Sequence, residues 1–534
     1  MWRFSERADL RQLMQTARGV TRDVVSPVVA AGGRSTHEWT SDKARVLRAL
    51  DDAGLTSIVT RSSGGVTMRL AAVLWELACV DGGAAVCSLS GSLAQMVVRD
   101  AGTQEQQFRY VGNAARRHGA LCVTEPVPGA GADAATLEGR VCVAQWKPGA
   151  QPLLDVDKRG RFTSHMDFAE FVVAAVDSGD ERIHGTCLVL LEPSDSGVFD
   201  RGVPVRKLGH QLSSTTSPVF RLQVPADRIL GGYTVENGVI IPTFNHREAL
   251  RSAFRRIGAV MALVTSAKLL SAVAAVIRLR RRNEQDDEWA GRLLDVWAAG
   301  EAAASLGFSA ARLCDEAGLD GQAQVICPAA KLFSTVTTCA MLPHVAAYGV
   351  GLRDKLADAQ LEAVYLGPEA IQRRQISAFM IDEDFRAQFA GWSRDMREAK
   401  TIAPCAGTIA AAMELWSWTL DRLREAALFR EARQSIPFSM ADALSELLAA
   451  RALSLDALTL EREDGAFYRD LGMIQSVHAA GRVVQICCGL LLRHDVAEGT
   501  MVDLRASVFA SFSGVAPARE RAIEFIRRRG EESE

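Results

Sequence analysis

The glycine-rich segment Gly129-Ala-Gly131-Ala-Asp133-Ala134 is the first place where residue types and spacing suggest cofactor chemistry. Its GxGxxA spacing is that of dinucleotide-binding loops, in which the backbone approaches a pyrophosphate at a helix N-terminus. That chemistry requires a strand leading directly into the glycines and a helix leaving them. Here Glu125-Pro126-Val127-Pro128 intervenes, and the next strand pattern follows soon afterwards. The segment therefore predicts a loop after a strand rather than a dinucleotide-binding fold.

Two arginine-rich segments could bind phosphate or nucleic acid. Residues 278–282 contain four arginines and follow a long apolar stretch; they are either the charged last turn of a helix or a phosphate-binding site. Near the C-terminus, arginines from 519 to 529 are mixed with glutamates, which favours a solvated helix end over a DNA-binding patch. The 61 Lys and Arg against 64 Asp and Glu also argue against a surface built for nucleic acid.

The eleven cysteines do not form a metal-binding pattern. Cys122, Cys142 and Cys187 lie within apolar runs and Cys487-Cys488 are adjacent, whereas zinc sites need CxxC or Cys/His spacings. We therefore predict small core residues in a reduced compartment and no metal site.

No membrane segment or secretory signal is expected. Charged residues such as Arg3, Glu6 and Arg7 interrupt the first 30 residues. The stretch 257–277 is long enough to span a membrane, but it contains Lys268 and several hydroxyl side chains, which favours a buried helix. The sequence therefore predicts a cytoplasmic protein.

The elements that would position these groups follow the order helices, sheet, helices. With 48% hydrophobic and only 6% aromatic residues, the composition suits packed helices. Apolar residues recur every three or four positions in 66–80 and 84–98. Short segments rich in β-branched residues follow, too closely spaced for helical crossovers, and they predict strands at 121–124, 168–176, 185–191 and 219–224.

Beyond about residue 237, helical patterns continue to the C-terminus. They predict helices at 247–282, 286–316, 321–349, 368–377, 405–431, 437–458 and 471–493. The fold class is therefore mostly α-helical with a central antiparallel β domain. The expected domains are an N-terminal helical domain (1–118), the β domain (119–236), a four-helix-type domain (237–385) and an additional helical domain (386–534).

Several blocks of the sequence resemble the acyl-CoA dehydrogenase family. Leu121-Cys-Val-Thr-Glu-Pro126, followed by Gly129-Ala-Gly-Ala-Asp133, is similar to the family's flavin-binding run Thr-Glu-Pro-Gly-Ala-Gly-Ser-Asp. Further similar blocks occur in the family's order at residues 102–110, 207–216, 224–232 and 365–373. The resemblance implies the family's α bundle, β domain and α bundle. The helical tail is similar to the extension of the very-long-chain branch.

The resemblance also implies a flavoprotein that binds FAD and oxidises an acyl-CoA thioester between its α and β carbons. This chemistry needs a carboxylate base, donors to the thioester carbonyl and a flavin that accepts hydride. The family's flavin contacts carry over to Leu121, Val123 and Thr124, for which a plain edge strand is the alternative. Thr163 corresponds loosely to the residue that flanks the isoalloxazine.

The position of the catalytic base has lost its carboxylate. The family's base follows the Tyr of a Tyr-Glu-Gly-Thr motif, where this chain has Leu366. Other members carry the base on the first long helix after the sheet, where the aligned residue is Arg251. Glu248 lies one turn earlier and could equally be a surface carboxylate. Since loss of a positioned base typically lowers the rate about 10²–10⁴-fold, ordinary dehydrogenation is not expected.

Other positions on the cofactor and substrate sides also depart from the family. Ala132 stands where a Ser contacts CoA, and Pro368 replaces the Thr of the Tyr-Glu-Gly-Thr motif. Pro343-His-Val-Ala346-Ala347 replaces a Gln-x-x-Gly-Gly segment that lies against the adenine, and 280–285 lacks the family's Phe-Gly. These changes weaken the adenine side of the expected FAD site.

Two functions follow from this pattern. The chain is either a divergent flavoprotein acting on a CoA- or carrier-bound acyl group, with a non-standard base or a reaction that needs none at Leu366, or a catalytically inactive homologue. The inactive homologue would be a structural or regulatory subunit of an active dehydrogenase. We expect a homo-oligomer, with a dimer favoured, or a hetero-oligomer with an active homologue. DNA binding through the mixed-charge tail is not expected.

Overall fold

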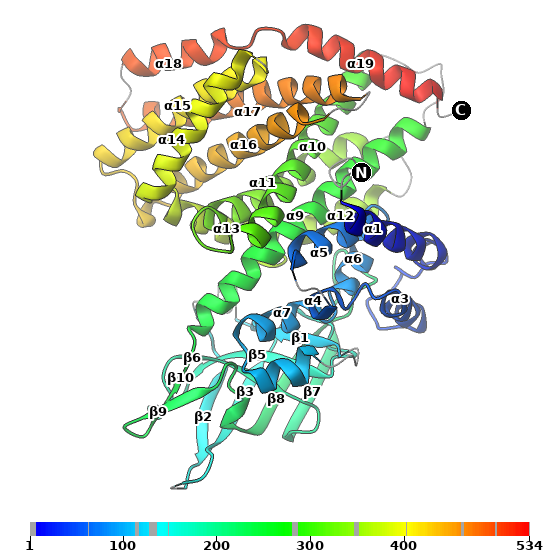
Figure 1. The fold of residues 1–534 in the computed structure, drawn as a ribbon, viewed down its shortest axis with the longest axis vertical. Helices are drawn as coiled ribbons and strands as arrows, with labels where there is room; N and C mark the ends of the chain where they lie inside the picture. Colours follow the sequence, from blue (N-terminus) through cyan, green and yellow to red (C-terminus); the bar gives the residue numbers. More distant parts are fainter. Residues whose placement is uncertain are drawn as a thin grey trace. The chain divides into compact units, whose positions relative to one another are not determined.

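The computed structural model describes most of the chain in two compact units, residues 1–257 and 258–534 (Figure 1). The division falls inside one long helix, α9 (His246–Leu279). The described residues are 7–61, 64–112, 117–127, 136–147, 149–279, 287–346, 352–401, 403–460, 464–496 and 499–532.

The first unit begins with helices, as the apolar periodicity predicts. They are α1 (Ala8–Val20), α2 (Ser26–Ala30), α3 (Ser41–Asp52), α4 (Ile58–Arg61), α5 (Val66–Ala78), α6 (Gly82–Ser88), α7 (Ser92–Ala101) and α8 (Gln104–Gln107). The single helix expected over 84–98 is two helices, because the chain turns at Leu89-Ser90-Gly91. Asp81 caps the first of them by accepting the Ala84 N–H at 2.7 Å.

The segment 102–110 forms a capped helix that is joined to the far end of the sheet region. Thr103 and Gln106 form a reciprocal capping box at the start of α8. The Gln106 amide nitrogen also donates to the carbonyls of Asp227 and Ile229 at 2.8 and 2.9 Å, and its oxygen accepts the Gly231 N–H at 2.9 Å. One buried amide therefore joins two of the sequence blocks, 102–110 and 224–232.

The central sheet has eight strands in the order β1-β5-β2-β3-β8-β4, with β6 paired to β5 and β7 to β8. They are β1 (Gly119–Cys122), β2 (Arg140–Gln145), β3 (Leu153–Arg159), β4 (Thr163–Ser164), β5 (Phe171–Ser178), β6 (Thr186–Leu191), β7 (Ser196–Pro204) and β8 (Thr215–Pro225). A hairpin of β9 (Tyr233–Glu236) and β10 (Val239–Pro242) follows. The four expected strands are all present.

Most strand pairs are antiparallel, as predicted, but β5 runs parallel to both β1 and β2. The short spacing of the strands excludes helical crossovers, and the return path from β2 to β5 is made instead by strands β3 and β4. Buried side chains line both faces of β5: Val172 and Ala174 pack in one apolar cluster, Phe171 and Val173 in another.

The second unit is helical throughout its described residues. After the remainder of α9 come α10 (Asp287–Glu316), α11 (Ala323–Ala346), α12 (Leu352–Glu362), α13 (Glu369–Phe379), α14 (Glu383–Glu398), α15 (Pro404–Glu425), α16 (Ser435–Leu458), α17 (Gly465–Arg493), α18 (Gly499–Ala510) and α19 (Val515–Glu532). One apolar cluster contains residues from helices as distant in sequence as Ala302, Trp416 and Val483. The C-terminal helices therefore share a core with those before residue 385.

Two helices are apolar and long enough to cross a bilayer by length and composition alone, 246–278 and 323–346. In each, 72% of the most apolar window is buried inside the protein. Such burial is what a core helix requires. Lys268, which interrupts the first of these windows, is fully buried and ion-paired to Glu362.

Candidate functional site

The chain that follows β1 is held by a buried ion pair between Lys158 and Glu125. Lys158 Nζ lies 2.6 Å from Glu125 Oε1 and donates to the Val123 carbonyl at 3.0 Å, and both charged side chains are almost completely buried. The Glu125 carboxylate also accepts the backbone N–H groups of Glu138 and Gly139. Because both charges are paired and hydrogen-bonded, this cluster holds the three residues after β1 in one path.

Thr124, the residue with the expected flavin-binding hydroxyl, follows directly on this strand. Its carbonyl accepts the Arg161 N–H at 2.8 Å, and its half-buried hydroxyl makes no hydrogen bond to the described residues. Leu121 is half-buried within β1, and Val123 is buried. Strand β1 pairs only on one side, with β5, among the described strands, so it lies at an edge of the sheet. This position agrees with flavin contact and also with the alternative from the sequence, a plain edge strand. Thr124 alone of the three offers a free side-chain polar group.

Thr163 lies beside the end of β1. It belongs to β4, where it pairs with Thr216 of β8, and its hydroxyl donates to Cys122 Sγ at 3.6 Å. Gly160 permits this approach, since a Cβ at that position would lie 2.6 Å from Cys122 Sγ and 3.0 Å from Thr163 Oγ1. The structure thus brings Thr163 to the strand that leads into Thr124, with its hydroxyl engaged by a buried thiol.

Gly160→Ala should destabilise the first unit by about 1–3 kcal/mol, because the added methyl overpacks the contact between β1 and β4. The change is measured as the free energy of unfolding in urea. Gly19→Ala is the matched control in the same unit: nothing lies within 4 Å of its Cβ, and alanine should be neutral or stabilising in helix α1. Equal stability of the two variants would contradict the proposed packing.

An exposed aromatic ring lies next to Thr163. Phe162 is 48% exposed, and the Arg161 guanidinium lies 4.5 Å from the centre of its ring. Arg161 is itself tied to the chain after β1 through the carbonyls of Thr124 and Pro126. A flat exposed ring and an unpaired hydroxyl on adjoining segments fit a planar ligand ring such as an isoalloxazine.

Part of the expected site lies outside the described residues. This applies to Ala132, to the glycine-rich loop around it and to residues 280–285. Ala346 is the last residue of α11, and Ala347 lies outside the described residues. The fit to FAD therefore rests on the isoalloxazine side, where Leu121, Val123, Thr124 and Thr163 would hold the ring.

A buried histidine supports the same region but was not singled out from the sequence. His165 is 1% exposed with a positive φ of 71°, and its Nε2 lies 3.0 Å from the Val86 carbonyl. Burial lowers the pKa of His165 to about 3. A lone histidine in a Phe-Thr-Ser-His run gives no sequence signal for this environment.

His165 should make the first unit sensitive to acid. Its folded pKa lies below the ordinary value of 6.5, so the unfolded chain binds the extra proton. The neutral ring contributes fully to the free energy of unfolding above pH 6.5. As the pH falls from 6.5 toward 3, this contribution decreases by up to about 1.4 kcal/mol per pH unit. His165→Asn keeps an N–H donor and tolerates a positive φ. Urea unfolding at pH 7 and pH 5 should show a smaller loss for this variant than for the wild type; equal losses would exclude His165 as the cause.

Leu366 occupies the expected base position in a strained turn. It has a φ of +54°, followed by Gly367 at +98°. The buried Lys331 donates to the carbonyls on either side of it, those of Tyr365 and Gly367, the latter at 2.6 Å. Burial, opposed by Glu369, lowers the pKa of Lys331 to about 7. A left-handed leucine costs about 1–2 kcal/mol, and the ammonium bridge holds the backbone there.

The alternative base position is also unable to accept a proton. Arg251 is exposed on α9 and forms an ion pair with Glu248 at 3.8 Å. The Glu248 carboxylate is also bound by Arg255, whose side chain is buried. Two guanidiniums therefore contact the one carboxylate near this position. Arg251 itself lies on the surface of the first unit.

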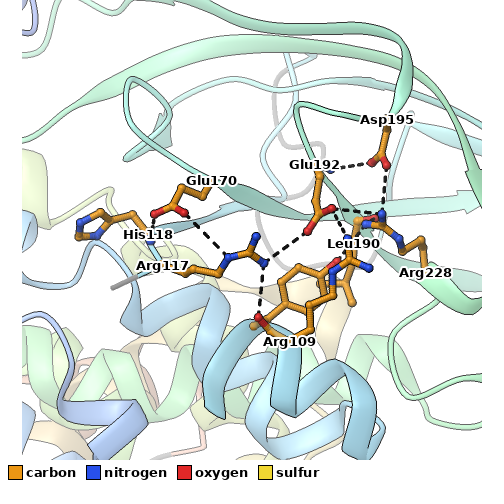
Figure 2. Close-up of polar contacts among 9 residues, drawn as sticks. Arg109, Arg117, His118, Glu170, Leu190, Glu192, Asp195 and Arg228 are labelled. Atoms are coloured by element: carbon orange, nitrogen blue, oxygen red, sulfur yellow. Dashed lines mark hydrogen bonds and ion pairs between the residues drawn. The ribbon is translucent and has the colours of Figure 1, made fainter. Parts of the chain in front are cut away.

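Sequence reasoning also missed a dense ion cluster around Glu192. Figure 2 shows Arg109, Arg117 and Arg228 converging on this carboxylate. Burial by itself would raise the pKa of Glu192, but Arg228 and Arg109 outweigh it and hold the pKa below the usual range. Asp195 joins the cluster through Arg228 at 3.1 Å.

This cluster is structural rather than catalytic. Arg228 also donates to the Tyr110 hydroxyl at 2.9 Å, and burial raises the pKa of Tyr110 to about 12. Arg109 and Tyr110 belong to the block 102–110, and Arg228 belongs to the block 224–232. The family resemblance of these two blocks was the only sequence signal for the cluster. It covers Arg109 and Arg228 but not the carboxylates, which lie between the two blocks in sequence. Among the described residues, no group of three His, Cys, Asp or Glu is arranged to hold a metal.

Comparison with a family model identifies the N-terminal part of the chain. Residues 7–118 match the model described as "Acyl-CoA dehydrogenase, N-terminal domain". No curated protein matches the sequence. The matched residues include the 102–110 block, whose Gln106 and Arg109 make the contacts described above.

Solved structures share the fold at low sequence identity. An acyl-CoA dehydrogenase complexed with FAD from Bacillus anthracis is 15% identical with a TM-score of 0.77, covering 98% of this chain and 96% of that one. Butyryl-CoA dehydrogenase from Megasphaera elsdenii is 17% identical with a TM-score of 0.60, covering 71% and 99%. Nitroalkane oxidase from Podospora anserina is 17% identical with a TM-score of 0.57, covering 72% and 97%.

The share of this chain that is covered differs between these neighbours. The two shorter neighbours are matched almost completely by about seven-tenths of this chain, whereas the Bacillus anthracis protein matches nearly all of it. The Bacillus anthracis protein therefore shares the fold over a larger part of this chain than the two shorter proteins do. Residues 7–118 therefore match the N-terminal domain of acyl-CoA dehydrogenases, and nearly the whole chain shares the fold of a protein described as an acyl-CoA dehydrogenase.

Proposed function

We propose that the protein binds FAD and an acyl group carried as a thioester on CoA or a carrier, and that it does not catalyse ordinary α,β-dehydrogenation unaided. The observation that carries this proposal is Leu366, a side chain without a proton acceptor at the position that the family resemblance assigns to the base. Retention of the Thr124 strand, whose hydroxyl makes no hydrogen bond to the described residues, supports flavin binding.

Each residue has a defined part in this proposal. Bound FAD would supply a ring that accepts hydride from an acyl β-carbon. The backbone of Leu121 and Val123 and the hydroxyl of Thr124 would orient the ring, and the Lys158–Glu125 pair fixes that backbone. Glu248, held by Arg251 and Arg255, is an ion-paired carboxylate rather than a free base. A substrate α-proton therefore has no side-chain acceptor at either expected position.

The visible spectrum of the purified full-length protein tests flavin binding. A bound-flavin absorption band, present on purification or after addition of FAD, is expected. A protein that stays colourless after addition of FAD would overturn the proposal. If flavin binds, anaerobic addition of a panel of acyl-CoAs should leave most of the flavin oxidised, and rapid bleaching by any of them would show that a base is present after all.

A second candidate is a structural or regulatory subunit of an active dehydrogenase. It is favoured by the absence of a proton acceptor at both Leu366 and Arg251. Size-exclusion chromatography of the chain alone and with an active homologue distinguishes the two. A homo-dimer with bound flavin supports the first candidate, whereas a stable hetero-oligomer without flavin in this chain supports the second. Both proposals place the protein in the cytoplasm.

A further inference from the structure

The second unit contains a cavity of about 540 Å³ between helices of the core and of the C-terminal extension. Its walls come from α10 and α11 on one side and from α16 and α17 on the other. These four helices pack against one another, as their neighbouring positions in Figure 1 indicate. Val296, Phe333 and Met341 form the apolar part of the wall. The volume falls within the range of about 300–1,000 Å³ that is typical of small-molecule sites.

Three polar side chains line the interior of this cavity without partners. Gln475 is 3% exposed and Thr337 is 9% exposed, and neither makes a side-chain hydrogen bond to the described residues. Glu446 lines the same space and has no hydrogen bond or ion pair within the described part of the chain. Burial raises the pKa of Glu446 to about 7, against the effect of Arg482. Unpaired buried polar groups are costly, so this interior is suited to a polar ligand group.

One exposed guanidinium at the cavity, that of Arg482, has no acidic partner among the described residues. Arg482 is exposed there, and its one hydrogen bond to the described residues is to Gln485, at 2.8 Å. Arg292 and the imidazoles of His344 and His478 also line the cavity; Arg292 forms an ion pair with Glu288 on the same helix, and burial lowers the pKa of His478. The Asp295 charge at the cavity is already neutralised by an ion pair to Arg519 from α19.

These features decide between two classes of anionic ligand. The chain of a fatty acid would fill the apolar wall but would leave the Gln475 amide, the Thr337 hydroxyl and the Glu446 carboxyl without hydrogen-bond partners, which disfavours it. A nucleobase has a flat face for Phe333 and Met341 and a hydrogen-bonding edge that an amide can pair with in a bidentate manner. Arginines that line the cavity suit a phosphate.

We propose that this cavity is a binding site for a nucleoside phosphate, whose base enters toward Gln475 and whose phosphate contacts Arg482 and Arg292. The site lies entirely within the second unit. It shares none of the flavin-binding residues Leu121, Val123, Thr124 and Thr163 proposed above, but its lining residue His344 belongs to the segment 343–347 that the family resemblance places against the adenine of FAD. FAD binding by the cavity variants therefore has to be measured beside nucleotide binding.

Isothermal titration calorimetry on the full-length protein tests the site, with ADP, GDP, inorganic phosphate and octanoate titrated separately. One equivalent of ADP or GDP should bind at least tenfold more tightly than phosphate, and octanoate should not compete with it. If neither nucleotide gives heat at about 1 mM, the proposal is overturned. A dissociation constant of about 1 mM corresponds to a binding free energy of about −4 kcal/mol. Tighter binding of octanoate than of the nucleotides would also overturn it.

Two variants locate the binding. Arg482→Ala, at an exposed position, should weaken nucleotide binding about tenfold, and Gln475→Leu should do the same while leaving phosphate binding unchanged. Arg424→Ala, at an exposed position in the last turn of α15, is the matched control and should bind nucleotide like the wild type. Thermal unfolding midpoints check that the variants remain folded. If Arg482→Ala weakens FAD binding in parallel with nucleotide binding, the cavity belongs to the flavin and the proposal of a separate site is wrong.

Discussion

Leu366→Glu is expected to raise the rate of anaerobic flavin bleaching by an acyl-CoA about 10²–10⁴-fold, because it restores a proton acceptor where the family resemblance places one. The wild-type backbone is already held on both sides of this residue by Lys331. A glutamate there should therefore adopt the same turn without rebuilding the loop. The measurement is stopped-flow absorbance of the flavin-loaded protein after mixing with each acyl-CoA.

The matched control is Leu366→Gln, which has nearly the same size and polarity as glutamate but no basic carboxylate. It should bleach no faster than the wild type. A flavin-loaded Leu366→Glu protein that bleaches at the rate of Leu366→Gln would show that the missing carboxylate is not what prevents the reaction. That outcome would favour the structural or regulatory subunit as the function.

Lys158→Met should lower the free energy of unfolding of the first unit by about 3–5 kcal/mol. It leaves the fully buried Glu125 carboxylate without its counter-charge and removes the donor to the Val123 carbonyl. The same variant should weaken FAD binding, since the path of the chain into Thr124 is no longer fixed. Urea unfolding and flavin titration measure the two effects.

Lys147→Met, at an exposed lysine in the same unit, is the control and should change the free energy of unfolding by less than about 0.5 kcal/mol. Adding Glu125→Gln to Lys158→Met should recover part of the lost stability, because a neutral amide replaces the unpaired charge. The loss in free energy of unfolding of the double variant is compared with the sum of the losses of the two single variants. If the loss of the double variant is the larger, Glu125 is held by its backbone donors and not by the lysine.

Elements with a local signature could be predicted from the sequence. The long helices α10, α16 and α17 follow directly from their apolar periodicity, and β5 and β6 from their β-branched residues. Strand β7 gave no such signal because its side chains are largely exposed, so it lacks alternation between buried and exposed positions. The division of 84–98 into α6 and α7 was missed because the intervening Leu89-Ser90-Gly91 turn is itself buried.

The candidate site was predictable only as far as similarity to known motifs extends. Those motifs identified Thr124, Thr163 and Leu366, but the groups that hold them in place are distant in sequence. Lys158 is separated from Glu125 by 33 residues and Lys331 from Tyr365 by 34. Neither lysine differs in type from a surface lysine, and only the fold places each one in the interior.

The parallel pairing of β1 with β5 has a consequence for the order in which the protein forms during its synthesis. Among the described strands, β1 pairs only with β5, whose register places Gly119 opposite Phe171. The ribosome must therefore add about 50 further residues, roughly 3–10 s at typical elongation rates, before the strand leading into Thr124 has a partner. Apolar side chains of this strand share a cluster with Phe171 and Val173 of β5, so they reach their full burial only after β5 has been synthesised.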